Sequence, residues 1–357
     1  MPSSTSNFDF QRPIPDLPWR GLLLATLLLT ALATVAWEIR ARTWGYAPCL
    51  NDTADLWADR REAVKPDSLV IVGDSRGLFD LDLDSLEQGL GQRPVQLALV
   101  GSCAYPILEN LANDTTFRGT VIVSFIPGMW MMPPPAPPYQ NSLRALNRYR
   151  ERTVAHRAGH HIGMFLEERL AFMKQDDLTL PQLLKNIQVP DRAVYHAPPR
   201  LPPYFATIDR ERQTRMIEAA AQPGPLQDRV KLGWAPLFTP PPMPAHTPQA
   251  VIDGIAQAIE GRFGQTVAAV QKIRSRGGKV VFVRFPHSGP LKELEDMGTP
   301  RTGIWTRMMQ ETGATNIYYS DHPELVYECP EWSHLSAEQT VEFTQRLVPH
   351  LKQALAQ

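Results

Sequence analysis

A serine stands directly after a short apolar run in the first third of the chain. Residues 68–72 read Ser-Leu-Val-Ile-Val and are followed by Gly73, Asp74, Ser75 and Arg76. Uninterrupted β-branched runs are typical of buried parallel strands. Ligands bind at the carboxyl ends of such strands, and the N-terminus of a following helix stabilises developing negative charge. The position favours Ser75 as a nucleophile; a plain strand-to-helix turn capped by Ser or Asp is the competing interpretation.

A histidine with an acidic residue three positions before it stands near the other end of the chain. Glu331 and His334 lie in the run Cys-Pro-Glu-Trp-Ser-His, just before the last predicted helix. A carboxylate at this spacing can point at the imidazole from the same loop, fix its tautomer and stabilise the imidazolium. The other ring nitrogen of His334 would then take the proton of Ser75. Because E-x-x-H alone is common in surface turns, this hypothesis depends on both elements occurring in one chain.

With these two elements the chain resembles the SGNH (GDSL-type) hydrolase and acyltransferase superfamily, over roughly residues 66–128 and 277–357. The G-D-S run matches the first block of the family. The resemblance implies Ser75 as nucleophile, with its own N–H as one oxyanion donor. The last block is usually D-x-x-H, and here it implies His334 as general base with Glu331 as its partner.

The two middle blocks of the family differ in how well they match. Gly101 follows the second apolar run, and the resemblance implies that its N–H is a second oxyanion donor. The third block, commonly G-x-N-D, is replaced by residues 124–129 (Ser-Phe-Ile-Pro-Gly-Met), which contain no asparagine. Loss of one oxyanion donor costs about 10² to 10³ in rate. Either another group substitutes, or activity is low.

Two further side chains are expected near the site. Arg76 adjoins the nucleophile, where it would bind an anionic group of a sugar or form an ion pair. His287 follows the fourth apolar run and is either a rival base or a residue of the substrate pocket. Three histidines on a predicted helix lack the carboxylate of the metalloprotease pattern, so no metal and no cofactor is predicted; they are His156, His160 and His161.

The three cysteines are too few and too scattered for a disulfide scaffold or a CxxC zinc site. Cys103 and Cys329 flank the two proposed active-site loops. Outside the cytoplasm they could form a disulfide, and Cys49 could pair with either of them.

Strand and helix patterns alternate on both sides of a long interruption. Further strands are predicted at residues 95–100, 120–126, 279–285 and 316–319, and helices at 81–90, 106–111, 248–276, 304–311 and 336–356. The last helix opens with a capping box of Ser336 and Gln339. Strand-helix alternation indicates an α/β fold with right-handed crossovers. The resemblance implies a three-layer, flavodoxin-like parallel sheet.

The interruption at about residues 131–250 holds the dense proline clusters. The chain contains 34 prolines, roughly twice the usual share of about 5%. Three clusters lie at residues 133–138, 198–203 and 240–244, with helices predicted at 153–174 and 210–221. An insertion of this size on an α/β core is typical of a lid, a binding surface or a partner site.

An apolar segment precedes the α/β region. Residues 21–37 carry no charge, which suits an uncleaved transmembrane anchor better than a signal peptide. We therefore expect a cytoplasmic tail (1–20), the anchor, a linker (38–65) and an SGNH-like domain (66–357). Basic residues are more numerous after the segment than before it, so the positive-inside rule does not by itself favour a cytoplasmic N-terminus, but long domains translocate largely regardless of charge. The catalytic interpretation suits a single-pass protein of the inner membrane whose domain lies in the periplasm.

Charge and resemblance together bound the function. The 36 basic and 37 acidic residues leave a net charge of -1, which excludes a nucleic-acid binder dominated by phosphate contacts. The motifs predict an esterase or O-acyltransferase that forms an acyl-Ser75 intermediate, and the resemblance implies an acylated carbohydrate or small ester as substrate. The resemblance implies acetyl groups of a surface or exported polysaccharide, with its assembly proteins as partners. The alternatives are a catalytically weak scaffold subunit and a lipid-ester hydrolase, the latter motivated by apolar residues 129–132.

Overall fold

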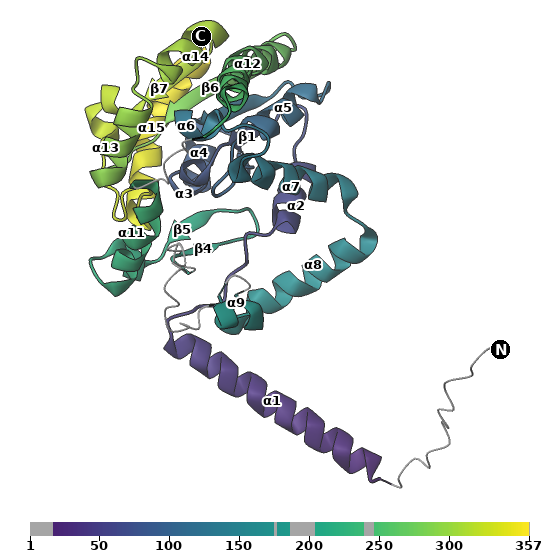
Figure 1. The fold of residues 1–357 in the computed structure, drawn as a ribbon. Helices are drawn as coiled ribbons and strands as arrows, with labels where there is room; N and C mark the ends of the chain where they lie inside the picture. The colour runs from purple at the N-terminus through teal and green to yellow at the C-terminus, as the bar shows by residue number, and fades with distance from the viewer. Residues whose placement is uncertain (1–16, 175–176, 186–203, 239–245, 357) are drawn as a thin grey trace, which may run out of the picture.

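Five parallel strands form the centre of the molecule. The computed structural model describes residues 17–174, 177–185, 204–238 and 246–356. The sheet order is β2-β1-β3-β6-β7 (Figure 1). The strands are β1 (Leu69–Val72), β2 (Val95–Gln96), β3 (Thr120–Ser124), β6 (Lys279–Arg284) and β7 (Thr315–Tyr318). The predicted α/β fold with a parallel sheet is confirmed.

The second strand is shorter than its apolar run suggested. Regular strand geometry ends at Gln96, yet the chain continues beside β1, because Leu97 N–H donates to Ile71 O (2.8 Å) and Leu99 N–H to Gly73 O (3.0 Å). Residues 97–100 therefore follow β1 as irregular backbone. They lead directly to Gly101.

Helices cover both faces of the sheet, as right-handed crossovers require. On one face α5 (Tyr105–Asn113), α12 (Gln249–Arg274) and α14 (Ile304–Thr312) pack together, and on the other α4 (Leu83–Leu90) packs on α15 (Ala337–Ala356). Helix α13 (Gly289–Gly298) follows β6. The predicted capping box before α15 is confirmed: Ser336 N–H donates to Gln339 Oε1 (2.9 Å) and Gln339 N–H to Ser336 Oγ (3.2 Å).

The N-terminal helix α1 (Trp19–Thr43) projects from the domain (Figure 1). Its mean hydropathy reaches 2.0, and by length and composition it could cross a membrane. Three threonine hydroxyls along it donate to the carbonyl four residues earlier, so their polarity is satisfied within the helix; they are Thr26, Thr30 and Thr34. The helix includes the predicted span and continues beyond it by about one turn and a half.

Parts of the predicted linker (38–65) have regular structure. Residues 38–43 end α1, and Ala54–Glu62 form α2. Trp57 of α2 is fully buried in the core and donates from Nε1 to Leu97 O (2.9 Å). The acidic residues that suggested a linker form ion pairs across to α7 (Pro137–Glu151), as between Asp55 and Arg148 (2.6 Å).

The insertion contains more regular structure than predicted. Just after α6 (Pro127–Trp130), it comprises α7, α8 (Val154–Glu167), η1 (Ala171–Met173), α9 (Leu180–Lys185), β4 (Ala206–Ile208), β5 (Thr214–Met216), α10 (Glu218–Ala221) and α11 (Pro225–Phe238). Helix α8 confirms most of the predicted helix at 153–174. The first proline cluster leads into α7, whose first residue is Pro137. The clusters at 198–203 and 240–244 lie outside the described residues.

The helix predicted at 210–221 is wrong over most of its length. Strands β4 and β5 form an antiparallel hairpin there, and only α10 is helical. Arg212, in the hairpin turn, has a φ of 62° and is fully buried. Its guanidinium pairs with Asp52 through two hydrogen bonds of 2.7 and 2.8 Å. This ion pair fixes the turn between β4 and β5. It joins residues far apart in the chain, so no local sequence pattern predicts it.

Close approach of β3 to the turn after β1 depends on two glycines. A Cβ on Gly73 would lie 2.4 Å from Ser124 Cβ, and one on Gly77 would lie 2.7 Å from the same atom. Real Cβ atoms do not approach so closely, so a larger residue at either position forces the backbone apart. The helix that begins after β1, α3 (Ser75–Phe79), is thereby seated on the end of β3.

We predict that Gly77→Ala lowers the free energy of unfolding by about 1 to 3 kcal/mol, because the added methyl overpacks the contact with Ser124. Gly254→Ala is the matched control. Nothing lies within 4 Å of a Cβ there, on α12, and helix propensity favours alanine by up to about 1 kcal/mol. Urea unfolding of the detergent-solubilised chain measures both. Equal stability of the two variants would contradict the contact.

Candidate functional site

Ser75 occupies the first position of α3, at the carboxyl end of β1. Asp74 caps this helix: its Oδ1 accepts from Arg76 N–H (2.9 Å) and from the Ser124 hydroxyl (3.2 Å). Burial raises the pKa of Asp74. Every other residue of α3 is buried, whereas Ser75 is partly exposed. Among the described residues nothing is hydrogen-bonded to its hydroxyl or its N–H, so both can meet a ligand.

Glu331 and His334 form a buried pair in the loop before α15. Glu331 Oε1 accepts from both the N–H (2.6 Å) and the Nδ1 (2.8 Å) of His334. Its Oε2 accepts from the indole N–H of Trp234 (2.6 Å). Burial alone would raise the pKa of Glu331, but the attraction of His334 and these hydrogen bonds lower it below the ordinary value. The carboxylate is therefore ionised.

The pair fixes the tautomer of His334. Because Nδ1 faces a carboxylate, it carries the proton, and Nε2 is left as an acceptor. Nε2 is buried and has no hydrogen-bond partner among the described residues. An unsatisfied buried acceptor of this kind costs free energy and needs a physical explanation. His334 is thus oriented as a base with one free nitrogen.

Helix α3 lies directly against this loop. The ring of Phe79 stacks on the imidazole of His334 at 4.4 Å between centroids. Arg76 Nε donates to Ser333 O (3.2 Å), and Asp80 Oδ1 accepts from the N–H of residue 335 (2.9 Å). Ser75 and Phe79 are four residues apart, so they share one face of the helix. No hydrogen bond joins the Ser75 hydroxyl to His334 among the described residues.

The backbone of the loop is strained beside Glu331. Trp332 has a φ of 79°, a left-handed conformation that is costly for a bulky residue. Its carbonyl accepts from Ser288 N–H (2.9 Å), and a Cβ on Gly289 would lie 2.6 Å from its indole. Phe238 of α11 packs edge-on against the same indole at 5.9 Å. These contacts keep the backbone at Trp332 in its strained conformation, next to the residue whose carboxylate pairs with the imidazole.

Arg76 is not a substrate-binding residue in this structure. Its side chain is fully buried, and its guanidinium donates twice to Glu295 (3.0 and 2.5 Å). Arg284 donates to the same carboxylate. Burial would raise the pKa of Glu295, but the two arginines lower it well below the ordinary value. Arg76 thus connects α3 to α13 through an ion pair, the second of the two roles predicted from the sequence.

His287 is not a rival base. It is buried beside this cluster, with Nε2 3.1 Å from the guanidinium of Arg284 and Nδ1 3.3 Å from Phe285 O. Burial, followed by the charges of Arg76 and Arg284, lowers the pKa of His287 to about 2. The imidazole is neutral, and both of its nitrogens are engaged. Its position is therefore structural.

Gly101 lies at the edge of the site. Its φ is 58°, in the region that favours glycine, and its carbonyl accepts from Asn141 Nδ2 (2.7 Å). Its N–H has no partner among the described residues. At the position of the absent asparagine, Ser124 instead donates to Asp74, and α6 begins at Pro127. Asn141 comes from the insertion.

The predicted disulfide is absent: Cys49, Cys103 and Cys329 are all free. Burial raises the pKa of Cys103 to about 11 and that of Cys329 well above its ordinary value, so neither is a reactive thiol.

The histidines of α8 have local roles. His156 completes a capping box with Thr153, and His160 Nε2 lies 3.1 Å from Asp59 Oδ2. One group of potential metal ligands occurs within the described residues, away from Ser75: His322, Glu324 and His350. There His350 Nε2 lies 2.7 Å from a carboxylate oxygen of Glu324, an ordinary exposed pair.

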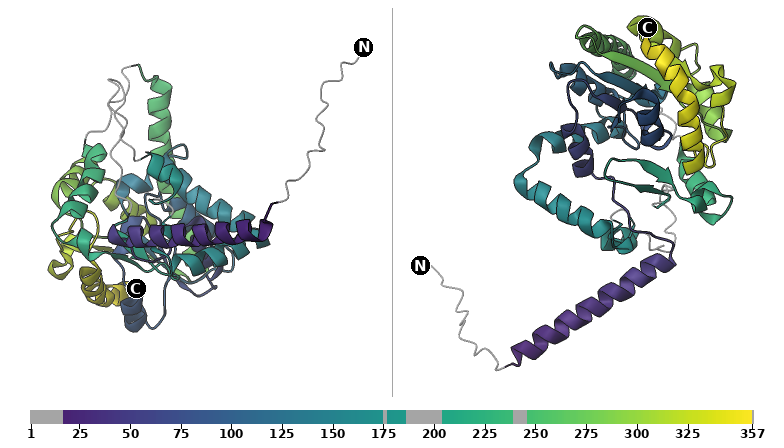
Figure 2. Two further views of the ribbon diagram at one scale, coloured as in Figure 1. Left: turned by 90° about the horizontal axis from the view of Figure 1, so that it is seen from below. Right: turned by 180° about the vertical axis from the view of Figure 1, so that it is seen from behind.

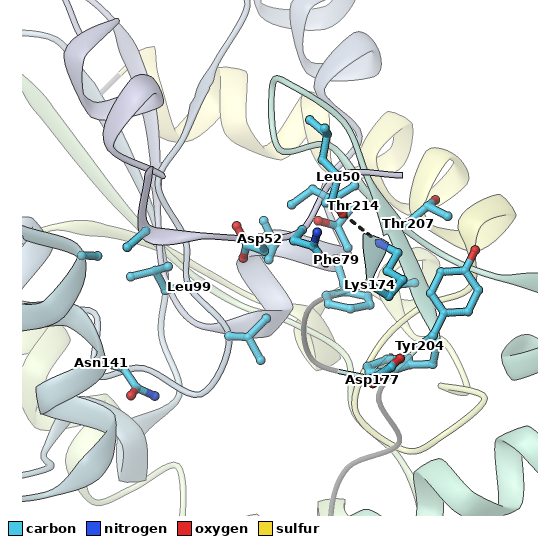
Figure 3. A pocket seen from close by; sticks show the side chains of 18 of the residues that line it. Leu50, Asp52, Phe79, Leu99, Asn141, Lys174, Asp177, Tyr204, Thr207 and Thr214 are labelled. Carbon is cyan, nitrogen blue, oxygen red and sulfur yellow. Dashed lines mark hydrogen bonds between the residues drawn. The ribbon is translucent and has the colours of Figure 1, made fainter. Parts of the chain in front are cut away.

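A cavity of about 550 Å³ opens beside Phe79 (Figure 3). Ser75, Glu331 and His334 are not among the residues that line it. Phe79 and Phe205 form part of its wall, stack on each other at 5.4 Å, and cover His334 at 4.4 and 6.2 Å. Other walls come from Leu50, Leu99, Asn141 and Tyr204. Lys174 donates to Leu50 O (3.0 Å) within it. The lining is mainly apolar and aromatic, with a few polar groups, as in small-molecule sites.

The chain matches none of the protein-family models, curated proteins or solved structures with which it was compared. Its site is therefore interpreted from geometry.

Sequence reasoning missed the contributions of the insertion. Trp234, Phe205 and Asn141 all reach the site from between β3 and β6. A tryptophan in a proline-rich segment carries no sequence signal of this role, because its partner Glu331 is almost a hundred positions away. Asp80 was missed as well. Burial raises its pKa to about 7, and its Oδ2 has no partner among the described residues.

We predict that Trp234→Phe lowers the free energy of unfolding by about 1.5 to 3 kcal/mol at neutral pH, because a buried carboxylate loses a hydrogen bond. The lowered pKa of Glu331 stabilises the fold above the ordinary value of 4.5, and this contribution is lost as pH falls below it. The difference from the parent should therefore shrink on acidification. Trp44→Phe, at an exposed position, is the control; chemical unfolding at several pH values measures both. A pH-independent difference would contradict the assignment.

Proposed function

We propose that this protein is a membrane-anchored serine esterase or O-acyltransferase that acts outside the cytoplasm on O-acyl groups, acetyl in the first place. One observation carries the proposal. A buried Glu331–His334 pair, with Nε2 of the imidazole unpartnered among the described residues, lies against the helix that begins with Ser75. Nucleophile, base and orienting carboxylate are the three parts of an activated serine site.

The topology supports an SGNH-type, flavodoxin-like assignment. Counted within the main sheet alone, the strand order is 2-1-3-4-5, which is that of flavodoxin-like doubly wound sheets. Ser75 follows the first strand of this sheet and His334 precedes the last helix. In such sheets ligands bind at the carboxyl ends of the strands where the order reverses, here between β1 and β3. Ser75 stands at that point.

The geometry suggests a two-step reaction. Ser75 Oγ attacks the acyl carbon while His334 Nε2 takes its proton, and Glu331 stabilises the imidazolium through Nδ1–H. The tetrahedral oxyanion would accept hydrogen bonds from the free N–H groups of Ser75 and Gly101. The C–O bond to the leaving alcohol breaks as His334 returns its proton to that oxygen. Water or a sugar hydroxyl then attacks acyl-Ser75 by the same route, which releases Ser75.

The substrate class is carried by the resemblance to SGNH enzymes, and the cavity beside Phe79 is compatible with it. Aromatic rings of Phe79, Phe205 and Tyr204 present apolar faces, and Asn141 adds an amide. Sugar rings combine apolar faces with hydroxyl groups, so an acylated carbohydrate suits this lining. We propose that the acceptor or donor belongs to a surface or exported polysaccharide, handled together with its assembly proteins.

A catalytically weak scaffold is the second candidate. It is favoured by the missing hydrogen bond between Ser75 and His334 and by the lack of an asparagine in residues 124–129. Catalytic hydrogen bonds are often long in free enzymes and shorten when substrate binds, so the first point does not exclude catalysis. The lipid-ester alternative rests on the anchor and on residues 129–132, of which Trp130 and Met131 are buried in the core while Met129 and Met132 are partly buried.

We predict that the purified full chain hydrolyses a soluble acetyl ester such as p-nitrophenyl acetate, and that Ser75→Ala abolishes this activity. His334→Ala should lower kcat/KM by about 10² to 10⁴, the usual contribution of a general base.

His156→Ala, which removes an exposed histidine from α8, is the matched control and should leave the rate unchanged. Circular dichroism and urea unfolding confirm that each variant is folded. Full activity of folded Ser75→Ala or His334→Ala would refute the mechanism, and a folded, inactive parent would favour the scaffold.

A further inference from the structure

The outward face of α8 is apolar. Val154, Ile162 and Phe165 are 84%, 64% and 52% exposed, and Leu166 beside them is also exposed. The packed side of the helix carries Met164 and Glu167, both buried. In a helix surrounded by water the exposed side would be the polar one. Here the pattern is reversed along three turns.

The charges around this face are basic or already paired. Glu167 is buried and accepts from Asn51 N–H (2.9 Å), and Glu168 pairs with Arg210. Arg169, at the C-terminal end of the face, lies over the ring of Phe165 at 3.7 Å and is more than half exposed. No acidic residue of α8 points out beside Ile162. The face therefore suits a surface of apolar chains and anionic groups.

The next helix continues the apolar surface. Leu180 and Leu184 of α9 are one turn apart and are 67% and 56% exposed. Figure 1 shows α9 at the end of α1, with α8 leading away from it. Both views in Figure 2 place these helices on the side of the domain from which α1 leaves. We call the exposed residues 154, 162, 165, 166, 180 and 184 the α8–α9 face.

Helix α1 is attached to this part of the insertion. Glu38 accepts from the N–H groups of Ala171 (3.1 Å) and Phe172 (3.2 Å), which open η1. Ala41 is buried in a small cluster with Ala171 and Leu178. These contacts lie between α8 and α9 in the chain. The end of α1 therefore sets the position of both helices relative to any membrane that α1 crosses.

The same end of α1 has the composition of a membrane boundary. Trp37 and Trp44 pack edge-on at 5.6 Å, and Arg40 lies over Trp44. Tryptophan and arginine are enriched where a transmembrane helix leaves the bilayer core. The boundary would thus lie at the level of η1 and α9.

We propose that the α8–α9 face lies in the interfacial layer of the membrane that α1 spans, as a second, monotopic contact with lipid. The bilayer is the occupant because the face is continuous with the end of α1 and, within the part of the chain that the structure describes, carries basic but no free acidic charge. The inference rests on α1 being the anchor and does not require catalysis at Ser75. Such a contact would hold the cavity, whose wall includes Leu50 just after α1, close to the bilayer surface.

The test uses the full chain in vesicles of phosphatidylcholine and phosphatidylglycerol. Cys49 is replaced by serine, and buried Cys103 and Cys329 remain, since they are inaccessible to reagent. An environment-sensitive fluorophore is then attached to one new cysteine in each of three variants: Ile162→Cys on the face, Leu28→Cys in α1, and Met297→Cys on α13. All three positions are more than half exposed. Lipids with brominated acyl chains quench only labels that reach the bilayer.

We expect strong quenching at positions 28 and 162 and none at 297, with blue-shifted emission at 162 that disappears in detergent. Quenching at 28 while 162 behaves like 297 would overturn the interfacial contact and leave the anchor intact. No quenching at 28 would remove the anchor and the proposal with it. Blue-shifted emission at 162 without quenching would also overturn it, because a protein partner or a second copy would then cover the face.

Discussion

One buried carboxylate organises the candidate site. Glu331 is excluded from water and accepts three hydrogen bonds: two from His334 and one from Trp234. An ionised carboxylate without such partners would be too costly to bury. Two parts of the chain must therefore be correctly placed together: the loop before α15, with its strained backbone at Trp332, and helix α11 of the insertion. The insertion is part of the site, because without it the Glu331 carboxylate would lose the hydrogen bond from Trp234.

A second constraint seats α3 beside that loop. Glycines at positions 73 and 77 let the turn after β1 touch Ser124, and buried Arg76 joins α3 to α13 through Glu295. The Arg76–Glu295–Arg284 cluster contributes no reacting group, yet it fixes the helix on which Ser75 stands. Arg76, a candidate substrate-binding residue in the sequence, thus serves to position the helix that carries Ser75. Removing one partner of such a buried ionic cluster destabilises the fold strongly, because an unpaired charge stays buried. Replacing the whole cluster with apolar residues would cost far less.

How much the sequence could predict follows from where each signal lies. Apolar runs and caps are local, so the strands, most helices and the pairing of Glu331 with the nearby His334 were accessible to it. Helix α2 was not predicted, because a highly charged segment is typical of a linker. Its acidic residues are paired only in the folded protein, by arginines at the end of α7. The sequence could not decide between the alternative roles of Arg76 and His287, because those roles depend on Glu295, which lies far from Arg76 in the chain. Trp234 was invisible, since only folding brings it to Glu331.

The most direct test of the account is to map the adduct of a fluorophosphonate probe by mass spectrometry. Such probes react with a serine only when a base activates it. The account predicts a single phosphonylated peptide that carries the label on Ser75 in the folded full chain, and its loss in His334→Ala. Folded parent protein that stays unlabelled at Ser75, or undiminished labelling of Ser75 in His334→Ala, would contradict it.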